Sequence, residues 1–491
     1  MNYAVIFKLL SVIMTAIGFA LSVSLGAGYL AGDHLIEAQA LHGFGISICI
    51  AFGLAVALYI LGPRGNFRML RKEALCVIGL GWILSCMTGA LPYFLVIPGC
   101  SLADAFFESV SGLTTTGATV FTELEQFPRS LMFWRQISQW IGGLGVVVFF
   151  VAILSFLGVG AKILYSRESS AESTELGSSR VQSGVLQILY LYLAISIVCT
   201  LAYHVCGMSW FDAICHMFTT IATGGFSTYS NSIAAFNNPL IEWMFILFMI
   251  LGGTSFLLIL RSLRGHWKDI FTNTEIRVFY ATLVISTIII MLFLFFNGIV
   301  DTPLDALRAS AFQVVSIATT SGFTTADFDA WVPATHVFLF VLMVIGGSSG
   351  STAGGLKVIR VVIGIKICLV NIEKAFRSHI VRPIKVNDRN ISTTAQENII
   401  IYIVLITIII YVSKCIIALL ENNLSLEGTY STVISCFYNI GPGFSEIGPT
   451  HTYAFFHDST KYYLSLLMIM GRLELYAILV LFIPSFWRRF S

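Results

Sequence analysis

Long stretches without Asp, Glu, Lys or Arg divide this chain, and they constrain its fold more than any other feature. They cover 9–32, 38–63, 74–103, 136–161, 181–211, 243–260, 278–300, 330–356 and 398–413. A further apolar stretch, 462–487, is interrupted only by Arg472 and Glu474. Because a helix needs about 20 apolar residues to cross the hydrocarbon core of a bilayer, the pattern predicts an all-α polytopic membrane protein with about ten spans.

The overall composition excludes a soluble enzyme. Hydrophobic residues make up 57% of the 491 residues and charged residues 11%, whereas soluble domains carry about 25% charged residues. The net charge of +2, without a block of basic residues, gives no indication of nucleic-acid binding. The ten cysteines contain no CxxC pair and the nine histidines no HExxH spacing, so we expect neither disulfides nor a bound structural metal.

Lysine and arginine gather on alternate connections between the predicted spans. The largest groups lie at 64–72, 162–180, 261–277 and 366–389, and Arg488 and Arg489 end the chain. Because basic residues are retained on the cytoplasmic side, both termini and these loops are predicted to be cytoplasmic. The first apolar stretch is longer than the core of a signal peptide, so we expect it to be a retained helix.

The connections on the opposite side repeat one pattern, a short apolar helix followed by a turn of small residues. The four segments are "DAFFESVSGLTTTGATVF" (104–121), "FDAICHMFTTIATGGFSTYS" (211–230), "ASAFQVVSIATTSGFTTADF" (309–328) and "TYSTVISCFYNIGPGFSEIG" (429–448). We align them on Gly117, Gly225, Gly322 and Gly443. The residues that precede these glycines are Thr114, Thr115 and Thr116; Ala222, Thr223 and Gly224; Thr319, Thr320 and Ser321; and Ile440, Gly441 and Pro442. A surface loop would explain one such segment but not four in register.

Turns of this kind at membrane depth have a specific physical use. Irregular backbone is tolerated there only when it is buried in protein or lines water. Glycine adopts positive φ without steric cost and lets backbones approach closely. Four turns around one axis would form a ring of carbonyl oxygens, which can replace the water shell of an alkali cation. The pattern therefore predicts a cation-selective pore.

A second polar stretch lies inside the predicted span 330–356. It comprises Gly346, Gly347, Ser348, Ser349, Gly350, Ser351, Thr352, Ala353, Gly354 and Gly355. Such residues have a low preference for helix, and serine and threonine can satisfy the freed backbone groups locally. We expect a loop that interrupts the helix and acts as a gate. Close packing of helices through small residues is the alternative.

Three charged residues lie within the apolar segments. Arg472 and Glu474, at membrane depth, are expected to face the interior or a cavity, or else to reach the headgroup region. Being two residues apart they cannot share a helix face, so Glu474 should pair elsewhere. Glu108, in the first short helix, is expected to hydrogen-bond the turn or to pack behind it.

Four aspartate and glutamate residues near the turns have simple explanations. Asp104 and Asp212 stand near helix starts, where capping suffices. Asp327 and Glu446 follow turns, where they would attract cations or be solvated loop charges.

These features resemble the Trk/Ktr/HKT superfamily of cation transporters, most closely the bacterial TrkH-type potassium uptake subunits. The resemblance rests on "GLTTTGATV", "RQISQWIGGLGV", "TGGFST", "ATTSGFTTAD", "GGSSGSTAGGLKVIR" and "MGRLELYAILVLF", which together cover all four repeats. It implies four M1–P–M2 repeats (span, pore helix, span) arranged with pseudo-fourfold symmetry around one pore, plus two additional N-terminal spans. The implied divisions are 1–63, then repeats at 64–172, 173–268, 269–390 and 391–491, with a gating loop at 346–357.

The resemblance also assigns roles. It implies a K⁺-selective filter with one glycine per repeat, here Gly117, Gly225, Gly322 and Gly443, with the three residues before each glycine as further K⁺ ligands. Some plant relatives with serine at the first position favour Na⁺, and this chain keeps glycine. Arg472 resembles an arginine that lies against the gating loop and opposes K⁺ passage.

The implied assembly is a homodimer in the bacterial inner membrane with a cytosolic, nucleotide-binding regulatory subunit of the TrkA type. No cofactor is expected in this chain, and nucleotide is expected only on that partner. The loops 162–180, 261–277 and especially 366–389 are candidate docking surfaces, with attraction to membrane lipids as the alternative.

A coupled symporter and a membrane-embedded enzyme are the two alternative functions. A symporter coupled to Na⁺ or H⁺ would favour carboxylates or broken helices at a midplane site, whereas the irregular backbone here clusters in the turns and one loop. A membrane-embedded enzyme would need a nucleophile and base or a metal cluster, and the spans contain no such pattern. We therefore expect a gated potassium pore and no enzymatic activity.

Overall fold

The structure, a computed structural model, describes residues 3–32, 34–62, 71–157, 177–377, 382–387 and 389–487. Across these ranges the chain is helical except for turns and one hairpin, formed by β1 (Lys385–Val386) and β2 (Arg389–Asn390). The predicted all-α fold is confirmed. Residues 64–70 and 162–176 of the first two basic loops, residues 378–381 of the fourth, and Arg488 and Arg489 lie outside the described residues, as do the predicted repeat boundaries near residues 64 and 172.

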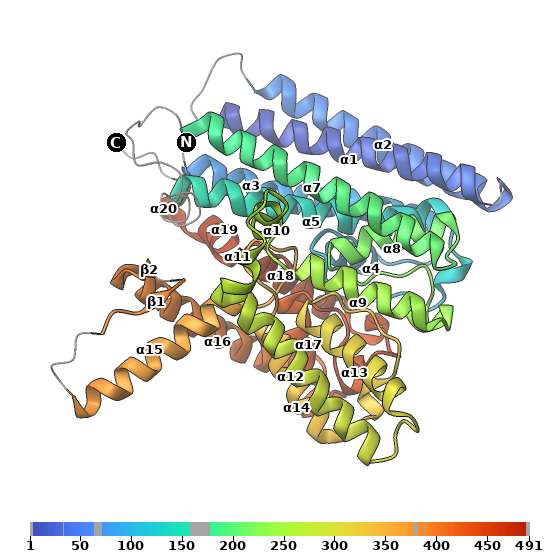
Figure 1. Cartoon of the computed structure of the whole chain (residues 1–491). Helices are drawn as coiled ribbons and strands as arrows, with labels where there is room; N and C mark the ends of the chain where they lie inside the picture. The colour runs from blue at the N-terminus through green and yellow to red at the C-terminus, as the bar shows by residue number, and fades with distance from the viewer. Residues whose placement is uncertain are drawn as a thin grey trace.

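Two long helices precede the repeats. α1 (Tyr3–Ala31) and α2 (His34–Leu61) pack against each other at one edge of the molecule (Figure 1). α1 also crosses α5 closely, since a Cβ atom on Gly28 would overlap the Ser130 backbone. Glu37 of α2 is buried and accepts a hydrogen bond from Ser130 N at 3.2 Å, where its charge favours a helix N-terminus. This pair therefore supports the start of α5.

Each repeat consists of a span, a pore helix and a second span. Repeat 1 comprises α3 (Arg71–Val96), α4 (Leu102–Leu113) and α5 (Arg129–Leu157). Repeat 2 comprises α7 (Gly177–Val205), α8 (Trp210–Ile221), α9 (Pro239–Gly253) and α10 (Phe256–Leu263), and α11 (Lys268–Thr272) follows it.

The second half of the chain repeats this plan. Repeat 3 comprises α12 (Thr274–Phe296), α13 (Pro303–Ala318), α14 (Pro333–Ile345) and α15 (Val358–Phe376). Repeat 4 comprises α16 (Thr393–Leu420), α17 (Leu426–Tyr438), α18 (Asp458–Arg472), α19 (Tyr476–Leu479) and α20 (Pro484–Trp487). Short 3₁₀ helices occupy Leu124–Gln126, Ser232–Phe236, Phe328–Ala330, Ser445–Ile447, Tyr453–Phe455 and Val480–Phe482.

The pore helices begin at hydroxyl caps. The side chains of Ser101, Ser209, Thr302 and Ser425 each accept a hydrogen bond from a backbone N–H in the first turn of the following helix. Such caps satisfy N–H groups that the helix itself leaves free. In the first three repeats the donor belongs to an aspartate, Asp104, Asp212 or Asp305, whose charge favours the helix N-terminus.

The membrane spans are of two kinds, continuous helices and broken ones. Six described helices are long and apolar enough to cross a membrane: α1, α2, α3, α7, α12 and α16. The pair α9 and α10 is bent by 99°, and α18 with the segment Tyr476–Phe482 is bent by 117°. The second spans of repeats 2, 3 and 4 are therefore broken, whereas the sequence predicted a broken helix only in repeat 3.

The ends of several helices gather at one end of the molecule. Ile6 and Leu10 of α1 form a buried cluster with Cys76 and Val77 of α3, and Phe486 of α20 packs against it. At the same end, α15 projects away from the bundle beside the hairpin β1–β2 (Figure 1). Ile363 and Ile367 of α15 pack against Ile384 and Val386 of the hairpin segment.

Candidate functional site

The four turns after the pore helices share one backbone conformation. In each turn the N–H of the residue before the central glycine is hydrogen-bonded to a carbonyl of the pore helix. The bonds are Thr116 N to Ser111 O, Gly224 N to Thr219 O, Ser321 N to Ser316 O and Ile440 N to Ser435 O, at 2.8–3.0 Å. Thr115, Thr223, Thr320 and Asn439 have φ between +53° and +57°. Non-glycine residues rarely adopt this conformation, so its recurrence marks a constrained site.

These hydrogen bonds correct the alignment of the fourth turn. Ile440 is equivalent to Thr116, so the glycine equivalent to Gly117 is Gly441. Gly117, Gly225, Gly322 and Gly441 all have positive φ, whereas Gly443 does not. The sequence alignment on Gly443 was therefore wrong by two residues, because the fourth turn contains two glycines around Pro442.

The correction changes which residues form the fourth turn. It consists of Tyr438, Asn439, Ile440 and Gly441, and Pro442 follows the glycine instead of preceding it. A sequence signal for this register exists. The number of residues from the capping serine to the glycine is the same for Ser101 and Gly117, for Ser209 and Gly225, and for Ser425 and Gly441. In repeat 3 the pore helix is longer, with 16 residues against 12 in α4, or about one helical turn.

The four turns contact one another in a closed ring. A Cβ atom added to each central glycine would overlap the carbonyl oxygen of the residue before the glycine in the next turn. Gly117 would meet Gly224 O, Gly225 would meet Ser321 O, Gly322 would meet Ile440 O, and Gly441 would meet Thr116 O. Since no other residue lacks a Cβ, glycine is required at all four positions. The ring closes in chain order, which places the turns around one axis.

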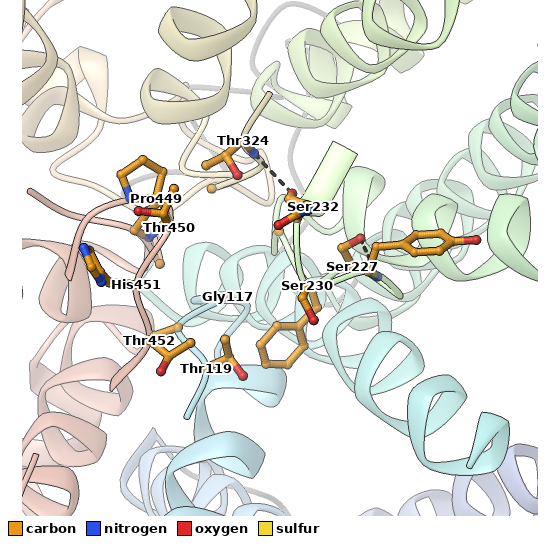
Figure 2. Close-up of a pocket in the computed structure, with 18 of the residues that line it drawn as sticks. Gly117, Thr119, Ser227, Ser230, Ser232, Thr324, Pro449, Thr450, His451 and Thr452 are labelled. Carbon is orange, nitrogen blue, oxygen red and sulfur yellow. Dashed lines mark hydrogen bonds between the residues drawn. The ribbon is translucent and has the colours of Figure 1, made fainter. Parts of the chain in front are cut away.

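A cavity of about 400 Å³ lies on one side of this ring. Its lining includes all four central glycines and polar residues of the segments that follow them, among them Thr119, Ser230, Thr324 and Thr452 (Figure 2). Asp327, which was expected near the pore mouth, is exposed and lines the cavity. Glu446 instead accepts hydrogen bonds from Ser425 N and Oγ at the start of α17, so it acts in capping.

The residues predicted to form a gate lie against the other side of the ring. Gly354 N donates to Thr320 Oγ1 at 2.6 Å, and Gly355 N donates to Tyr438 O at 3.2 Å. Thr352 Oγ1 donates to Ile221 O at 2.9 Å, at the end of α8. The segment between α14 and α15 is therefore attached beneath three of the four turns.

Further contacts hold the rest of this segment. Ser348 N and Oγ both donate to Gly253 O, where α9 ends. Ser349 N donates to Glu275 Oε1 at 2.6 Å, from the first turn of α12. Lys357 Nζ donates to Ala353 O within the segment. Within the segment, Ser351 Oγ donates to Ser348 O at 2.6 Å, which is the local satisfaction that the sequence predicted. The hydroxyls of Ser348 and Thr352 instead donate to carbonyls at the ends of α9 and α8.

Arg472 and Glu474 have separate partners. Arg472 is 4% exposed and its Nη1 donates to Thr352 O at 2.7 Å. Its Nε and Nη2 atoms are buried without a hydrogen-bond partner among the described residues. Glu474, in the bend after α18, pairs with Arg360 of α15 at 2.6 Å. The prediction that Glu474 pairs away from Arg472 is confirmed.

Behind the ring lies a buried charged pair. Glu108 of α4 and Arg135 of α5 are 0% and 1% exposed, and Arg135 Nε donates to Glu108 Oε1 at 2.7 Å. Glu108 was expected to contact the turn backbone, and its Oε2 accepts from Val120 N, just beyond the turn. Gln139, one turn after Arg135, donates to Gly224 O at 2.6 Å and accepts from Phe226 N at 3.2 Å.

The sequence pattern did not indicate a role for Arg135 or Gln139. An available signal was the arginine at the edge of an apolar stretch, since a buried arginine requires an anion.

Comparisons with known proteins agree with this architecture. The model of the TrkH family, described as cation transport protein, matches residues 72–489. The Trk system potassium uptake protein TrkH of Salmonella typhimurium is 34% identical over 446 residues, covering 89% of this chain and 91% of that protein. The protein of the same name from Escherichia coli K12 is 35% identical over the same length and coverage.

A solved structure is also similar. The crystal structure of the potassium transporter TrkH from Vibrio parahaemolyticus matches with a TM-score of 0.89 at 29% identity, covering 99% of this chain and 100% of that chain. The family model and the curated relatives both span most of the chain. The chain therefore belongs to the TrkH family of cation transport proteins and is a transporter, not an enzyme.

Proposed function

We propose that the chain takes up K⁺ across the bacterial inner membrane through a gated pore whose filter is formed by the four turns. The observation that carries this proposal is the closed ring of glycine–carbonyl contacts among Gly117, Gly225, Gly322 and Gly441. Carbonyl oxygens without full charge can replace the hydration of a monovalent cation and still release it. The relatives are potassium uptake proteins by name, which favours K⁺ as the transported ion.

The filter ligands that we propose follow the corrected register. They are the backbone oxygens of Thr114 to Gly117, Ala222 to Gly225, Thr319 to Gly322 and Tyr438 to Gly441. In each turn the residue two before the glycine has positive φ, as has the glycine itself. Because φ alternates between negative and positive values, successive carbonyls point to one side of the turn. In a β-strand they would point alternately to opposite sides. This conformation supports a filter several ligands deep.

We propose that residues 346–357 close the pore beneath this filter and that Arg472 holds them there. The hydrogen bond from Arg472 Nη1 to Thr352 O and the burial of the guanidinium group support this role. A buried positive charge below the filter also raises the energy of a passing cation.

We further propose that the protein is a homodimer with both termini in the cytoplasm, regulated by a TrkA-type nucleotide-binding subunit. The basic segments 261–277 and 366–389 support a cytosolic docking surface, and α15 extends from the bundle in the second of them (Figure 1). Membrane lipids are the competing ligand for these charges.

The test is cation flux into liposomes that contain the purified protein. We expect K⁺ to pass in preference to Na⁺, with the current reversing at the K⁺ equilibrium potential. A reversal potential that follows the Na⁺ or H⁺ gradient instead would identify a coupled symporter. Equal passage of K⁺ and Na⁺ would contradict the proposed filter.

A further inference from the structure

The contact between turns 1 and 2 differs from the other three contacts of the ring. Arg135 Nη1 donates to Ser227 O at 3.2 Å, beyond Gly225, and its Nη2 donates to Thr119 Oγ1 at 3.2 Å, beyond Gly117. One guanidinium group therefore holds the outer segments of two neighbouring turns. Both Thr119 and Ser227 line the outer cavity (Figure 2).

The position of this guanidinium is fixed on all sides. Glu108 accepts from its Nε, and the ring of Phe226 lies 3.8 Å from its central carbon. Glu108 also accepts from Val120 N and Thr119 Oγ1, so the carboxylate itself is tied to the outer segment of turn 1. Planar guanidinium groups with several directed donors give such fixed geometry, which a lysine would not reproduce.

The equivalent positions of the other repeats carry no such pair. By the corrected register, Glu108 corresponds to His216, Gln313 and Thr432. Gly142, Gly252 and Gly471 approach the equivalent carbonyls Leu113 O, Ile221 O and Phe437 O. Counted back from these glycines, and from Gly346 in repeat 3, Arg135 corresponds to Phe245 of α9, Leu339 of α14 and Leu464 of α18. His216 reaches Ser227 Oγ at 3.0 Å and Gln313 reaches Thr325 Oγ1 at 3.4 Å, each within its own repeat. The other neighbouring outer segments are linked by Thr324 N to Ser232 Oγ, Ser445 N to Asp329 Oδ1 and Tyr453 N to Thr119 O. Among the described residues, an arginine therefore holds only the contact between turns 1 and 2.

We propose that Arg135, held by Glu108, is a positioning residue that sets the cation selectivity of the filter. The clamp fixes the spacing of turns 1 and 2, and the ring in turn transmits that spacing to the carbonyls that meet the ion. Ions of different radius require different carbonyl spacing, so a loosened contact would admit Na⁺ more readily. This inference rests on the proposed function, since it presumes that the ring is the filter.

The test compares variants of the clamp with variants of a matched pair. The clamp variants are Glu108→Gln, Thr119→Val and the double substitution Glu108→Gln with Arg135→Met, which leaves no unpaired buried charge. The matched control is Glu242→Gln with Arg308→Met, because that Glu–Arg pair joins α9 to pore helix α13 at 3.0 Å without contacting a turn. Full-length proteins are reconstituted in liposomes, and uptake of K⁺, Na⁺ and Rb⁺ is measured together with thermal unfolding in detergent.

We expect the double variant to lower the ratio of K⁺ to Na⁺ uptake about tenfold and Thr119→Val to lower it about threefold, as expected for charged and single neutral hydrogen bonds. The control pair should leave the ratio unchanged. A purely structural role would reduce uptake of all three cations equally, and that result, or a ratio within about twofold of the native one, overturns the inference. If the double variant aggregates, the uptake ratios of Glu108→Gln and Thr119→Val test the inference by the same criteria. Failure of the native protein to prefer K⁺ would instead overturn the proposed function.

Discussion

Repeats 1 and 3 begin with the same plan and end differently. In both, a capped pore helix leads to a turn with positive φ at Thr115 and Gly117 or at Thr320 and Gly322. Their second spans then diverge, since α5 continues as one helix over Arg129–Leu157 whereas α14 ends at Ile345.

The divergence follows a pair of glycines. In α5 the pair Gly142–Gly143 is followed by apolar residues, and a Cβ on Gly142 would overlap Leu113 O. In repeat 3 the pair Gly346–Gly347 is followed by serine, glycine and threonine. Glycine allows close approach to the pore helix, and the helix preference of the next residues decides whether the helix resumes. Repeat 1 therefore has a continuous helix behind its turn, while repeat 3 has the irregular segment that we propose as the gate.

The prediction with the largest expected effect tests whether the turns of repeats 1 and 3 are equivalent. Gly117→Ser and Gly322→Ser should each lower the K⁺ to Na⁺ uptake ratio by about a hundredfold, because each adds a side chain at positive φ against a neighbouring carbonyl. Flux assays in liposomes measure the ratio. A large fall in the ratio for only one of the two variants would show that the two turns are not equivalent.

The same assay sharpens the register of the fourth turn. Gly441→Ser should match Gly117→Ser, whereas Gly443→Ala should keep a ratio close to the native one, since the atoms nearest its Cβ belong to the side chains of Ile447 and Ser431, which can shift, and not to a neighbouring turn. If Gly443→Ala lowered the ratio and Gly441→Ser did not, the alignment on Gly443 would be correct.

The next effect concerns the segment that only repeat 3 contains. Arg472→Met removes the donor to Thr352 O and a buried charge, so K⁺ uptake should rise about tenfold. Tracer uptake at fixed protein density checks this. The control is Lys414→Met, on α16, whose ammonium lies over Tyr430 and away from the segment. Unchanged uptake for Arg472→Met would contradict a closed segment.

A smaller rise should follow from Thr352→Val. This substitution keeps the shape of the side chain but removes hydrogen bonds to Ile221 O and Gly252 O. A net loss of about 1 kcal/mol would raise uptake about threefold to fivefold. Lower uptake would mean that Thr352 stabilises the open pore instead.

The smallest effect concerns the stability of α5. Gly142→Ala should destabilise the protein by about 1–3 kcal/mol, because its methyl group would overlap Leu113 O. Gly145→Ala, in the same helix, meets only Trp82 at 3.7 Å and should be neutral or slightly stabilising. Thermal unfolding of the two variants in detergent measures the difference. Equal stability would show that α5 does not depend on close approach to the pore helix.

Much of the fold follows from local patterns in the sequence. Apolar length predicts the long helices, and the recurring turn predicts four repeats, because both signals depend on residues that are near in the chain. The break after Gly253 was missed because Phe256 to Leu260 is apolar and continues the charge-free stretch. The signal was the Gly-Gly-Thr-Ser sequence, in which two small polar residues follow the glycine pair.

The site was predicted less completely. The glycines of the first three turns stood out, but in "NIGPGF" the sequence offers two glycines. The spacing from the capping serine favours Gly441 but was not used, and the hydrogen bond from Ile440 N to Ser435 O shows that Gly441 is the equivalent residue. Arg135 and Glu108 lie on different helices, so only the fold brings them together. Three-dimensional contacts of this kind leave no period or spacing in the sequence.

Because the four turns belong to one chain, each can carry a side chain that the others lack. In a channel assembled from four identical subunits, an arginine behind one turn would be present behind all four, and the like charges would repel one another around a narrow axis. Here Arg135 occurs once, with one carboxylate beside it. Four repeats in one chain let a mutation change one quadrant of the ring while the other three stay as they are.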